Sequence, residues 1–477
     1  MIIADRETVL KTPELADVMR RIVGSKNVLS TLEDRICYSC DGSKQQYLPD
    51  IVAQPCTTQQ VSKILCFAHE HNIPVYPRGA GSGLTGGAVP VMGGIVLDFS
   101  RMNRIMEIMP EDLTATVEPG VVTQTLQNEV ARYKLFYPPD PASAAFSTIG
   151  GNVAECSGGI TGLKYGVTRD YILALEIVLA DGSVIHTGRK TLKSVTGYDL
   201  TRLFVGSEGT LGVFTKITVK LIPLPETVET LLAFFQTPAD AIKTASQIVA
   251  NNLLPRALEF IDKSSIDCIK AYNRAFKIPA ETNAILLIDV DGRASSVTTE
   301  SSLIEKIVVE NHALEVTTAK NSQERNALWE VRRAISPALY NIAPFKINED
   351  ICVPRSQILE ILERIADINE RYPLLKVANF GHVGDGNIHV NVMYKDGKSQ
   401  RAMAEGMIDE ILHATVELGG TISGEHGIGN VKSAFVPLEI PPQELQIMRN
   451  IKQLLDPKGI LNPAKIFTQT NNKQPLQ

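Results

Sequence analysis

The chain has 477 residues, a length that suits two or three domains and excludes a single small one. Its hydrophobic content of 44% and charged content of 21% indicate a globular protein with a packed core. The formal net charge of −6, with Lys and Arg scattered rather than grouped, argues against nucleic acid or an anionic membrane surface as a partner.

The N-terminal residues and the cysteines both favour a cytoplasmic protein. Residues 1–15 include acidic side chains from Asp5 onward and lack the apolar core of a secretory signal. No run in the chain reaches the roughly eighteen apolar residues that a membrane span needs. The seven cysteines are irregularly spaced and odd in number, which predicts reduced thiols. Cys37 and Cys40 form a lone CxxC, which favours structural thiols over a metal or redox motif.

The first half of the chain predicts a helical lead-in followed by an α+β domain. Residues 1–44 form the lead-in, where apolar side chains recur at helical spacing. Residues 45–225 alternate helix and strand, and Thr57 or Thr58 caps the first helix. The expected strands of this domain are IPVYPRG, GGIVLDFS, TATVEPG, ALEIVLADGSVIHTG and GVFTKITVKLIP.

The second half predicts another α+β unit at 226–430 and a C-terminal segment at 431–477, which begins as helix and ends in turns. No repeat, low-complexity tract or long linker interrupts the chain, so we expect the units to pack closely. The expected elements are a strand, turn and helix in LLAFFQTPADAIKTASQIVANNLL, a strand in NAILLIDVDG, helices around 301–311 and in QERNALWEVRRAISPALY, two strands joined by a glycine turn in KVANFGHVGDGNIHVNVMY, and a helix in EGMIDEILHATVELGG.

A glycine-rich loop follows the strand IPVYPRG. Gly81, Gly83 and Gly86 satisfy the pattern GxGxxG, which in a dinucleotide-binding fold leads into a helix. Here Pro90 and another strand follow, so no helix N-terminus faces a pyrophosphate and a nicotinamide site of that type is excluded. Bare backbone N–H groups can instead form a concave nest for phosphate oxygens. A flexible turn is the alternative, but further glycine-dense segments favour a buried diphosphate-bearing cofactor: STIGGNVAECSGG, KYGVTRDY and GSEGTLG.

These segments, with VEPGV and YPPDPAS, resemble the FAD-binding domain of the vanillyl-alcohol oxidase and p-cresol methylhydroxylase family. Downstream, GHVGDGNIHVN, SGEHGIG and LNPAKIF resemble the FAD-linked oxidase C-terminal domain. The resemblance covers residues 45–467 and points to the branch that holds D-lactate dehydrogenase, D-2-hydroxyglutarate dehydrogenase and the flavin-binding chain of glycolate oxidase. It implies an α+β fold with a two-subdomain FAD-binding domain, an α+β substrate (cap) domain and a C-terminal segment that returns to the flavin.

The resemblance also implies which residues contact FAD. Ser82 stands where some relatives tether FAD through a histidine, so we expect FAD to be bound without a covalent link. The implied contacts are Pro77, Arg78, Gly79, Ala80, Gly81, Ser82, Gly83, Leu84 and Thr85 around the pyrophosphate; Pro139, Asp140, Gly150, Gly151 and Asn152 along the flavin; Gly158, Gly166, Glu208, Gly209 and Val213 along adenine, ribose and ring; and Asn462 at the isoalloxazine.

Two glycine-bounded segments gather histidine and carboxylate side chains. Strand alternation puts His389 and Asn391 on one face, and a glycine turn can bring His382 alongside. Glu425 and His426 lie between glycines, on backbone that can approach a site closely. From the residues alone, structural histidines and a divalent metal site with open positions both remain. The resemblance implies His382, His389 and Glu425 as ligands of zinc, iron or manganese, with His426 as the catalytic base.

A 2-hydroxy acid also needs its carboxylate held. Arg332 and Lys346 match positions that bind the substrate carboxylate in related dehydrogenases, as a bidentate clamp and a point charge. Arg333 competes with Arg332, because adjacent helical residues cannot both face one spot. Asn391 could hydrogen-bond the hydroxyl or the carboxylate.

The resemblance therefore implies FAD-dependent oxidation of a small D-2-hydroxy acid, glycolate or D-lactate, to the 2-oxo acid. We expect a metal to lower the pKa of the substrate hydroxyl, His426 to take its proton, and hydride to pass to the flavin. The chain has no cysteine cluster or quinone site, so electrons pass to a partner protein, which in relatives is an iron–sulfur subunit or an electron-transfer flavoprotein. A homo- or hetero-oligomer fits this scheme.

Three alternatives stay open. The substrate could be D-2-hydroxyglutarate, because the sequence does not choose among the small 2-hydroxy acids. The chain could instead be a non-catalytic, flavin-binding subunit of a glycolate oxidase complex. The intact set of His389, Glu425 and His426 argues against this second alternative. A transferase similar to alkyl-dihydroxyacetonephosphate synthase shares the FAD domain, and the pair HVGDGNIH and SGEHG argues against it.

Overall fold

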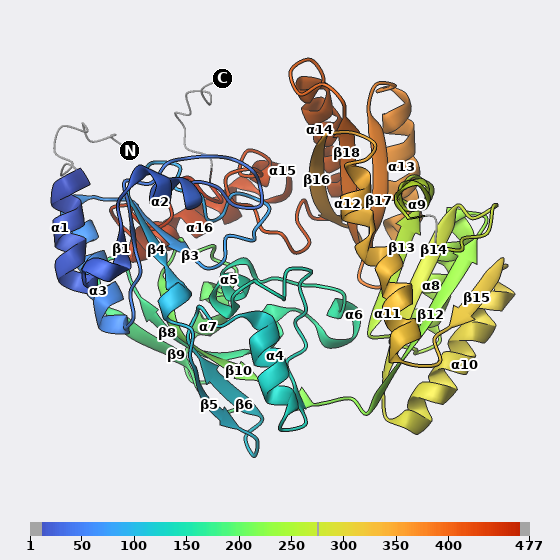
Figure 1. Cartoon of the computed structure of the whole chain (residues 1–477), viewed down its shortest axis with the longest axis horizontal. Helices are drawn as coiled ribbons and strands as arrows, with labels where there is room; N and C mark the ends of the chain where they lie inside the picture. The colour runs from blue at the N-terminus through green and yellow to red at the C-terminus, as the bar shows by residue number, and fades with distance from the viewer. Residues whose placement is uncertain (1–11, 274–275, 468–477) are drawn as a thin grey trace. The chain divides into compact units, whose positions relative to one another are not determined.

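The computed structural model describes residues 12–273 and 276–467, and the chain divides into two compact units (Figure 1). Within the described ranges, no helix is long and apolar enough to cross a membrane. The first unit combines the chain up to Ser157 with Val167–Leu224 and the stretch from Glu425 onward, and the second combines Gly158–Gly166 with Pro225–Gly424.

The first unit contains a four-stranded sheet in the order β1-β2-β4-β3. Strands β2 and β3 both run parallel to β4, and β1 joins the edge antiparallel to β2. β1 lies in the lead-in that the sequence pattern predicted as helical, and two residues are too few to show a strand period. The strands are β1 (Val28–Leu29), β2 (Ile51–Ala53), β3 (Val75–Arg78) and β4 (Ile95–Asp98).

A five-stranded antiparallel sheet in the order β5-β6-β10-β8-β9 and a two-stranded ribbon β11-β7 belong to the same unit. The long strands β8 and β10 are rich in β-branched and aliphatic residues, which favour a buried strand. The strands are β5 (Ile105–Met109), β6 (Thr114–Val117), β7 (Leu135–Phe136), β8 (Ile172–Val178), β9 (Val184–Gly188), β10 (Val213–Lys220) and β11 (Ile222–Pro223).

Helices of the first unit pack on these sheets. α1 buries Leu15 and Met19 in one cluster with residues of α3 and β2. α3 begins after the N-cap Thr57, whose side chain accepts a hydrogen bond from the N–H of Gln60. The helices are α1 (Thr12–Val23), α2 (Leu32–Cys37), α3 (Thr58–His71), α4 (Thr123–Ala131), α5 (Ile149–Glu155), α7 (Leu200–Phe204), α15 (Val436–Glu439) and α16 (Pro442–Leu455).

The stretch after Gly429 was expected to be helical and is helical only from α15 onward. Proline fits the first turn of a helix and disrupts its interior, so Pro437 and Pro442 sit in the first turns of α15 and α16. After α16 the chain returns to β3: Leu461 pairs with Val75 in a parallel bridge. This return places the C-terminal segment inside the first unit.

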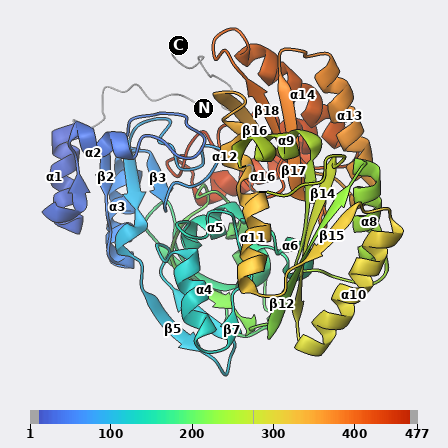
Figure 2. The same cartoon turned by 45° about the vertical axis from the view of Figure 1, so that its right-hand side comes forward.

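The second unit is built on a seven-stranded sheet in the order β15-β12-β14-β13-β17-β18-β16. Helices α8, α10, α13 and α14 pack on one face, and α9, α11 and α12 pack on the other (Figure 2). The strands are β12 (Thr227–Phe235), β13 (Ala257–Asp262), β14 (Ala284–Gly292), β15 (Glu315–Thr318), β16 (Phe345–Cys352), β17 (Lys376–His382) and β18 (Asn387–Tyr394). The helices are α6 (Gly162–Tyr165), α8 (Pro238–Ala250), α9 (Lys263–Tyr272), α10 (Ala294–Glu310), α11 (Ser322–Arg333), α12 (Ile335–Leu339), α13 (Ile358–Glu370) and α14 (Arg401–Glu417).

The segment QERNALWEVRRAISPALY was expected to form one helix and forms two, α11 and α12, which meet at Ala334. Pro337 explains the break. It has no N–H to donate, and its ring would clash with the carbonyl of Arg333 four residues earlier in a continuous helix.

Candidate active site

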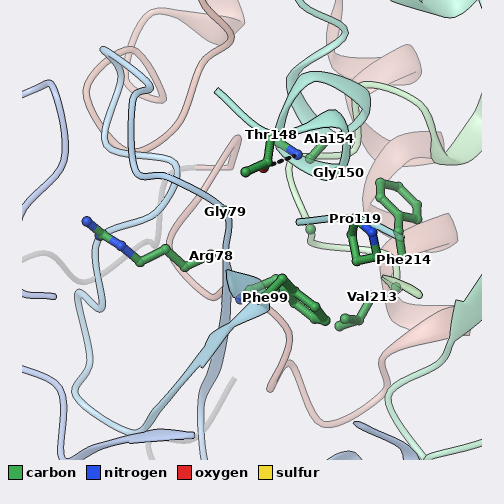
Figure 3. Close-up of a pocket in the computed structure, with 13 residues that line it drawn as sticks. Arg78, Gly79, Phe99, Pro119, Thr148, Gly150, Ala154, Val213 and Phe214 are labelled. Atoms are coloured by element: carbon green, nitrogen blue, oxygen red, sulfur yellow. Dashed lines mark hydrogen bonds between the residues drawn. The ribbon is translucent and has the colours of Figure 1, made fainter. Parts of the chain in front are cut away.

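A pocket in the first unit lies at the end of β3, where the chain enters the glycine-rich loop (Figure 3). Its other walls come from the first turn of α5 and from the turn that leads into β10. The lining residues are Pro77, Arg78, Gly79, Phe99, Pro119, Thr148, Gly150, Gly151, Ala154, Gly209, Gly212, Val213 and Phe214.

Two glycines of this pocket have no room for a side chain. A Cβ at Gly79 would lie 2.1 Å from Oγ1 of Thr148, and one at Gly150 would lie 2.5 Å from Cβ of Pro119. Thr148 itself caps α5, because its Oγ1 accepts a hydrogen bond from the N–H of Gly151 at 3.3 Å. At these two positions the pocket wall is bare backbone, which suits a ligand that must approach the main chain.

Among the buried polar atoms of the first unit that lack a hydrogen-bond partner are three on residues of the glycine-rich segments and the C-terminal return: Nη1 of Arg78, Oγ of Ser207 and Oδ1 of Asn462. Buried polar atoms are nearly always paired in native proteins, so these three indicate a polar ligand. A guanidinium donor suits a diphosphate, and hydroxyl and amide oxygens suit ribose or ring atoms. The residues present therefore fit FAD.

Part of the predicted FAD set lines the pocket: Pro77, Arg78, Gly79, Gly150, Gly151, Gly209 and Val213. Asn152 instead donates its amide to Oγ1 of Thr123 at 2.8 Å. Asn462 donates its amide to the carbonyls of Gly87 and Glu208 at 2.9 and 2.6 Å. The predicted residues outside the pocket lining are Ala80, Gly81, Ser82, Gly83, Leu84, Thr85, Pro139, Asp140, Asn152, Gly158, Gly166, Glu208 and Asn462.

Gly158 and Gly166 bound a segment that belongs to the second unit. Lys164, between them, donates to Oδ1 of Asp291 at 2.6 Å, and the hydroxyl of Tyr165 donates to Oδ2 of the same carboxylate at 2.9 Å. This short stretch, which includes α6, is therefore fixed to the end of β14.

In the second unit, charged side chains gather on the sheet face that packs against α9, α11 and α12. Glu259 lies opposite His382, and Asp350 lies opposite His389, in antiparallel pairs. Directly opposed residues share a face of a sheet. Phe380, two residues before His382 and opposite His389, is part of the core cluster on that face. The pairing register therefore brings both predicted metal-binding histidines to one side of the sheet.

Glu259 is fully buried and joins two of the predicted site residues. Its Oε2 accepts from Nε of Arg332 at 2.7 Å, and its Oε1 contacts Nδ1 of His382. Burial alone would raise the pKa of this carboxyl, but the charges of His382 and Arg332 hold the pKa down at about 2. A carboxylate bound to one ring nitrogen orients the imidazole, so that the other nitrogen can face a metal.

Asp350 and His389 form a second pair on the same face. Oδ1 of Asp350 lies 3.6 Å from Nδ1 of His389, and it accepts from Nδ2 of Asn387 at 2.6 Å. The rings of His382 and His389 have centroids 5.2 Å apart and are nearly perpendicular. Imidazole and carboxylate side chains are common ligands of divalent metals, so Asp350 and His389 are candidate ligands on this face.

Glu425 and His426 follow directly on Gly424, whose N–H donates to the carbonyl of Asp350 at 3.1 Å. The side chains of Glu425 and His426 remain 16% and 17% exposed. The carbonyl of His426 accepts from Oγ1 of Thr85 at 3.1 Å.

The remaining predicted substrate residues lie on the same sheet face as Asp350. Lys346 donates to Oγ of Ser336 at 3.1 Å, and its Nζ lies 5.0 Å from the ring centroid of Tyr340. Asn391 is fully buried, and its Oδ1 accepts from Nδ2 of Asn348 at 2.9 Å.

Two family models match consecutive parts of the chain. The model described as FAD binding domain matches residues 49–188, and the model described as FAD linked oxidases, C-terminal domain, matches residues 224–466. The chain belongs to the FAD-linked oxidase family. It is an FAD-binding oxidoreductase, which confirms the predicted family and enzyme class.

Relatives of this FAD-linked oxidase match along most of their length. The glycolate oxidase subunit GlcD of Bacillus subtilis (strain 168) is 43% identical, with 97% of this chain and 98% of that protein covered. The D-lactate dehydrogenase of Archaeoglobus fulgidus is 38% identical, with 87% and 91% covered. A solved structure of p-cresol methylhydroxylase with substrate bound has a TM-score of 0.81 at 19% identity, with 98% of this chain and 99% of that chain covered. This likeness confirms the predicted fold class.

Sequence reasoning on this FAD-linked oxidase missed Glu259 and Asp350. Glu259 interrupts the apolar strand ALEFID, and Asp350 follows Glu349 in the buried part of the strand FKINEDIC. Acidic residues are rarely buried without a partner, so a carboxylate in such a strand indicates a buried cation or a ligand site. The pattern signals a site but does not name the partner, because the partners lie far away in the sequence.

Proposed function

We propose that this FAD-linked oxidase converts a small D-2-hydroxy acid, glycolate or D-lactate, to the 2-oxo acid. The observation that carries the proposal is the grouping of Glu259, Arg332, His382, Asp350 and His389 on one sheet face of the second unit. That face offers a cation for a carboxylate beside a donor set for a metal, the two features that a 2-hydroxy acid needs. The names of two relatives, glycolate oxidase subunit and D-lactate dehydrogenase, support the same substrate class.

The residues of the chain divide the work of binding and proton transfer. Arg332 binds Glu259 through Nε, so its two terminal nitrogens are left to face the substrate carboxylate as a fork. Lys346 adds a second positive charge on the same face. His426 takes the hydroxyl proton, because an imidazole accepts a proton near neutral pH. FAD, when bound without a covalent link in the pocket of the first unit, supplies the hydride acceptor.

The metal ligands in this proposal are His382, His389 and Glu425, and we add Asp350. Within the second unit, Oδ1 of Asp350 lies 3.6 Å from Nδ1 of His389, which supports both as ligands. Glu259 contacts Nδ1 of His382, which leaves Nε2 of this histidine as the nitrogen that would bind the metal. A zinc, iron or manganese ion, when bound, supplies a Lewis acid that favours loss of the hydroxyl proton.

Electrons leave the reduced flavin through a partner protein in this proposal, either an iron–sulfur subunit or an electron-transfer flavoprotein. The support is that GlcD of Bacillus subtilis is named as a subunit. The glycine-rich loop also lies between strands β3 and β4 with no helix between them, which removes the usual nicotinamide site.

A dye-reduction screen of the purified protein tests the proposal. The panel contains glycolate and both enantiomers of lactate and 2-hydroxyglutarate, with a redox dye as acceptor and NAD in a parallel arm. We expect dye reduction with glycolate or D-lactate, none with L-lactate, and no reduction of NAD. If D-2-hydroxyglutarate alone reduces the dye, the substrate is D-2-hydroxyglutarate and not glycolate or D-lactate. If no compound of the panel bleaches the flavin, the proposal is wrong.

A further inference from the structure

The loop 425–431, which carries His426, is held inside the first unit by two buried side chains from distant parts of the sequence. We propose that Glu208 and Thr85 are positioning residues that fix this loop and therefore the base His426. The inference rests on the proposed function for the role of His426, but the contacts that carry it lie in the first unit alone.

Glu208 holds the loop through both oxygens of one carboxylate. Its Oε1 accepts from the N–H of Ile428 and its Oε2 from the N–H of Gly429, both at 2.7 Å. Hydrogen bonds to an ionised group are shorter and stronger than neutral ones. Because the two donors belong to consecutive peptides, the carboxylate fixes the orientation of both peptide planes.

The backbone of Glu208 is itself immobilised, so the carboxylate has a rigid support. Its N–H donates to the carbonyl of Ala154 at 2.8 Å, and its carbonyl accepts from Nδ2 of Asn462 at 2.6 Å. Its φ of 51° lies in the left-handed region, which a residue other than glycine adopts only where its surroundings hold it. A left-handed backbone conformation is energetically unfavourable for glutamate, so the surrounding contacts must hold Glu208 in it.

Thr85 holds the loop on the other side of Gly427. Its Oγ1 donates to the carbonyl of His426 at 3.1 Å. Its own carbonyl accepts from the N–H groups of Asn430 and Val431 at 3.2 and 3.1 Å. The peptide that follows His426 is therefore bound directly, and the chain beyond it is bound at four further N–H groups.

Gly427 shows how closely the loop lies against these supports. Its φ is +81°, and a Cβ there would lie 2.0 Å from Oε2 of Glu155 and 3.2 Å from Oε1 of Glu208. An L side chain at this φ is strained, and its Cβ would also have to displace the carboxylate of Glu155. Both carboxylate oxygens of Glu208 accept backbone N–H groups of the loop, so the geometry gives its side chain a positioning role.

Hydrogen–deuterium exchange with Glu208→Gln tests the contact without using enzyme activity. A glutamine has one acceptor oxygen and turns an N–H toward the second donor, so exchange at Ile428 or Gly429 should rise by about tenfold or more. Asp456→Asn is the matched control, because Asp456 is buried and accepts from the consecutive N–H groups of Ile460 and Leu461. It should raise exchange at those two residues and leave the loop 425–431 unchanged.

Single-turnover flavin reduction tests the consequence for catalysis. Glu208→Gln should lower the reduction rate by about tenfold at saturating substrate, with KM within about twofold and FAD content unchanged, because the base is displaced while substrate groups are not. Asp456→Asn should keep the wild-type rate. For Thr85, Thr85→Val should lower the rate more than Thr85→Ser, which keeps the donor hydroxyl.

Each result has a separate meaning. Unchanged exchange at Ile428 and Gly429 in Glu208→Gln, or raised exchange with a wild-type reduction rate while His426→Asn is slow, would overturn the positioning role. A wild-type rate in His426→Asn itself would instead show that the proposed function has the wrong base.

Discussion

Nε of Arg332 donates to Oε2 of Glu259 at 2.7 Å, and this pair joins helix α11 to strand β13 inside the second unit. The guanidinium also lies over the ring of Phe380, with its central carbon 4.5 Å from the ring centroid. Arg332 is therefore held by a buried carboxylate and an aromatic face before any substrate arrives. Such support orients a binding group in advance and reduces the cost of ordering it.

Replacing Arg332 by Met should destabilise the second unit by about 3–5 kcal/mol, because Glu259 stays buried with one cation fewer. Arg333→Met is the matched control on the same helix. The ion pair of Arg333 with Glu330 joins side chains that are 52% and 61% exposed, so its loss should cost at most about 1 kcal/mol. Denaturant unfolding followed by circular dichroism measures both. Equal losses of stability in the two variants would contradict a structural role for the Glu259 pair.

Asp350→Asn and His389→Ala should each lower the amount of bound metal, because both residues belong to the proposed ligand set. Elemental analysis of the purified variants measures the metal, and flavin reduction should fall with it. His413→Ala, which changes an exposed histidine on α14, should keep the wild-type metal content. Full activity of the wild-type protein after exhaustive chelation, with no metal found, would rule the metal out.

FAD should come away from the denatured protein, since Ser82 offers no imidazole nitrogen for the covalent tether found in some relatives. After acid precipitation and centrifugation, the flavin absorbance should be in the supernatant. A flavoprotein with a covalent tether, treated in the same way, keeps its colour in the pellet and serves as the control. Yellow colour retained in the pellet of this protein would contradict the prediction.

His426→Asn should keep the fold, the FAD content and the metal content but lower the rate of flavin reduction by on the order of a hundredfold. The physical reason is that asparagine cannot accept the hydroxyl proton. Stopped-flow measurement of flavin bleaching gives the rate. His382→Ala and Glu425→Ala should lose metal first and activity as a consequence, so the ratio of metal to activity separates a base from a ligand.

Thr57→Ala should destabilise the first unit by about 1 kcal/mol, because it removes the N-cap hydroxyl of α3, which accepts from the N–H of Gln60. Thr125→Ala, at an exposed position inside α4, is the control and should change stability by no more than about 0.5 kcal/mol. Thermal unfolding of the two variants gives the comparison. Indistinguishable melting temperatures would show that the cap contributes nothing.

The sequence by itself determined the local features of this protein. Apolar spacing, proline positions and capping residues are local, so they predicted α3 with its cap at Thr57 or Thr58 and the paired strands β17 and β18 around the glycine turn. The family motifs identified an FAD-linked oxidase, because glycines that must bring bare backbone to a diphosphate leave a pattern at fixed spacing. The break at Pro337 was also readable from the sequence, and overlooking it merged α11 with α12.

Only the tertiary structure decided which distant side chains meet. Glu259 and His382 are 123 positions apart, and Glu208 and Gly429 are 221 positions apart. The register of β13 with β17 brings the first pair together, and the return of the chain to the first unit after Gly424 brings the second. Neither contact leaves a periodic signal, because hydrophobic patterning specifies faces and not partners. For that reason the motif indicated Glu208 as a cofactor contact, and only the structure revealed that its carboxylate also binds the loop that carries His426.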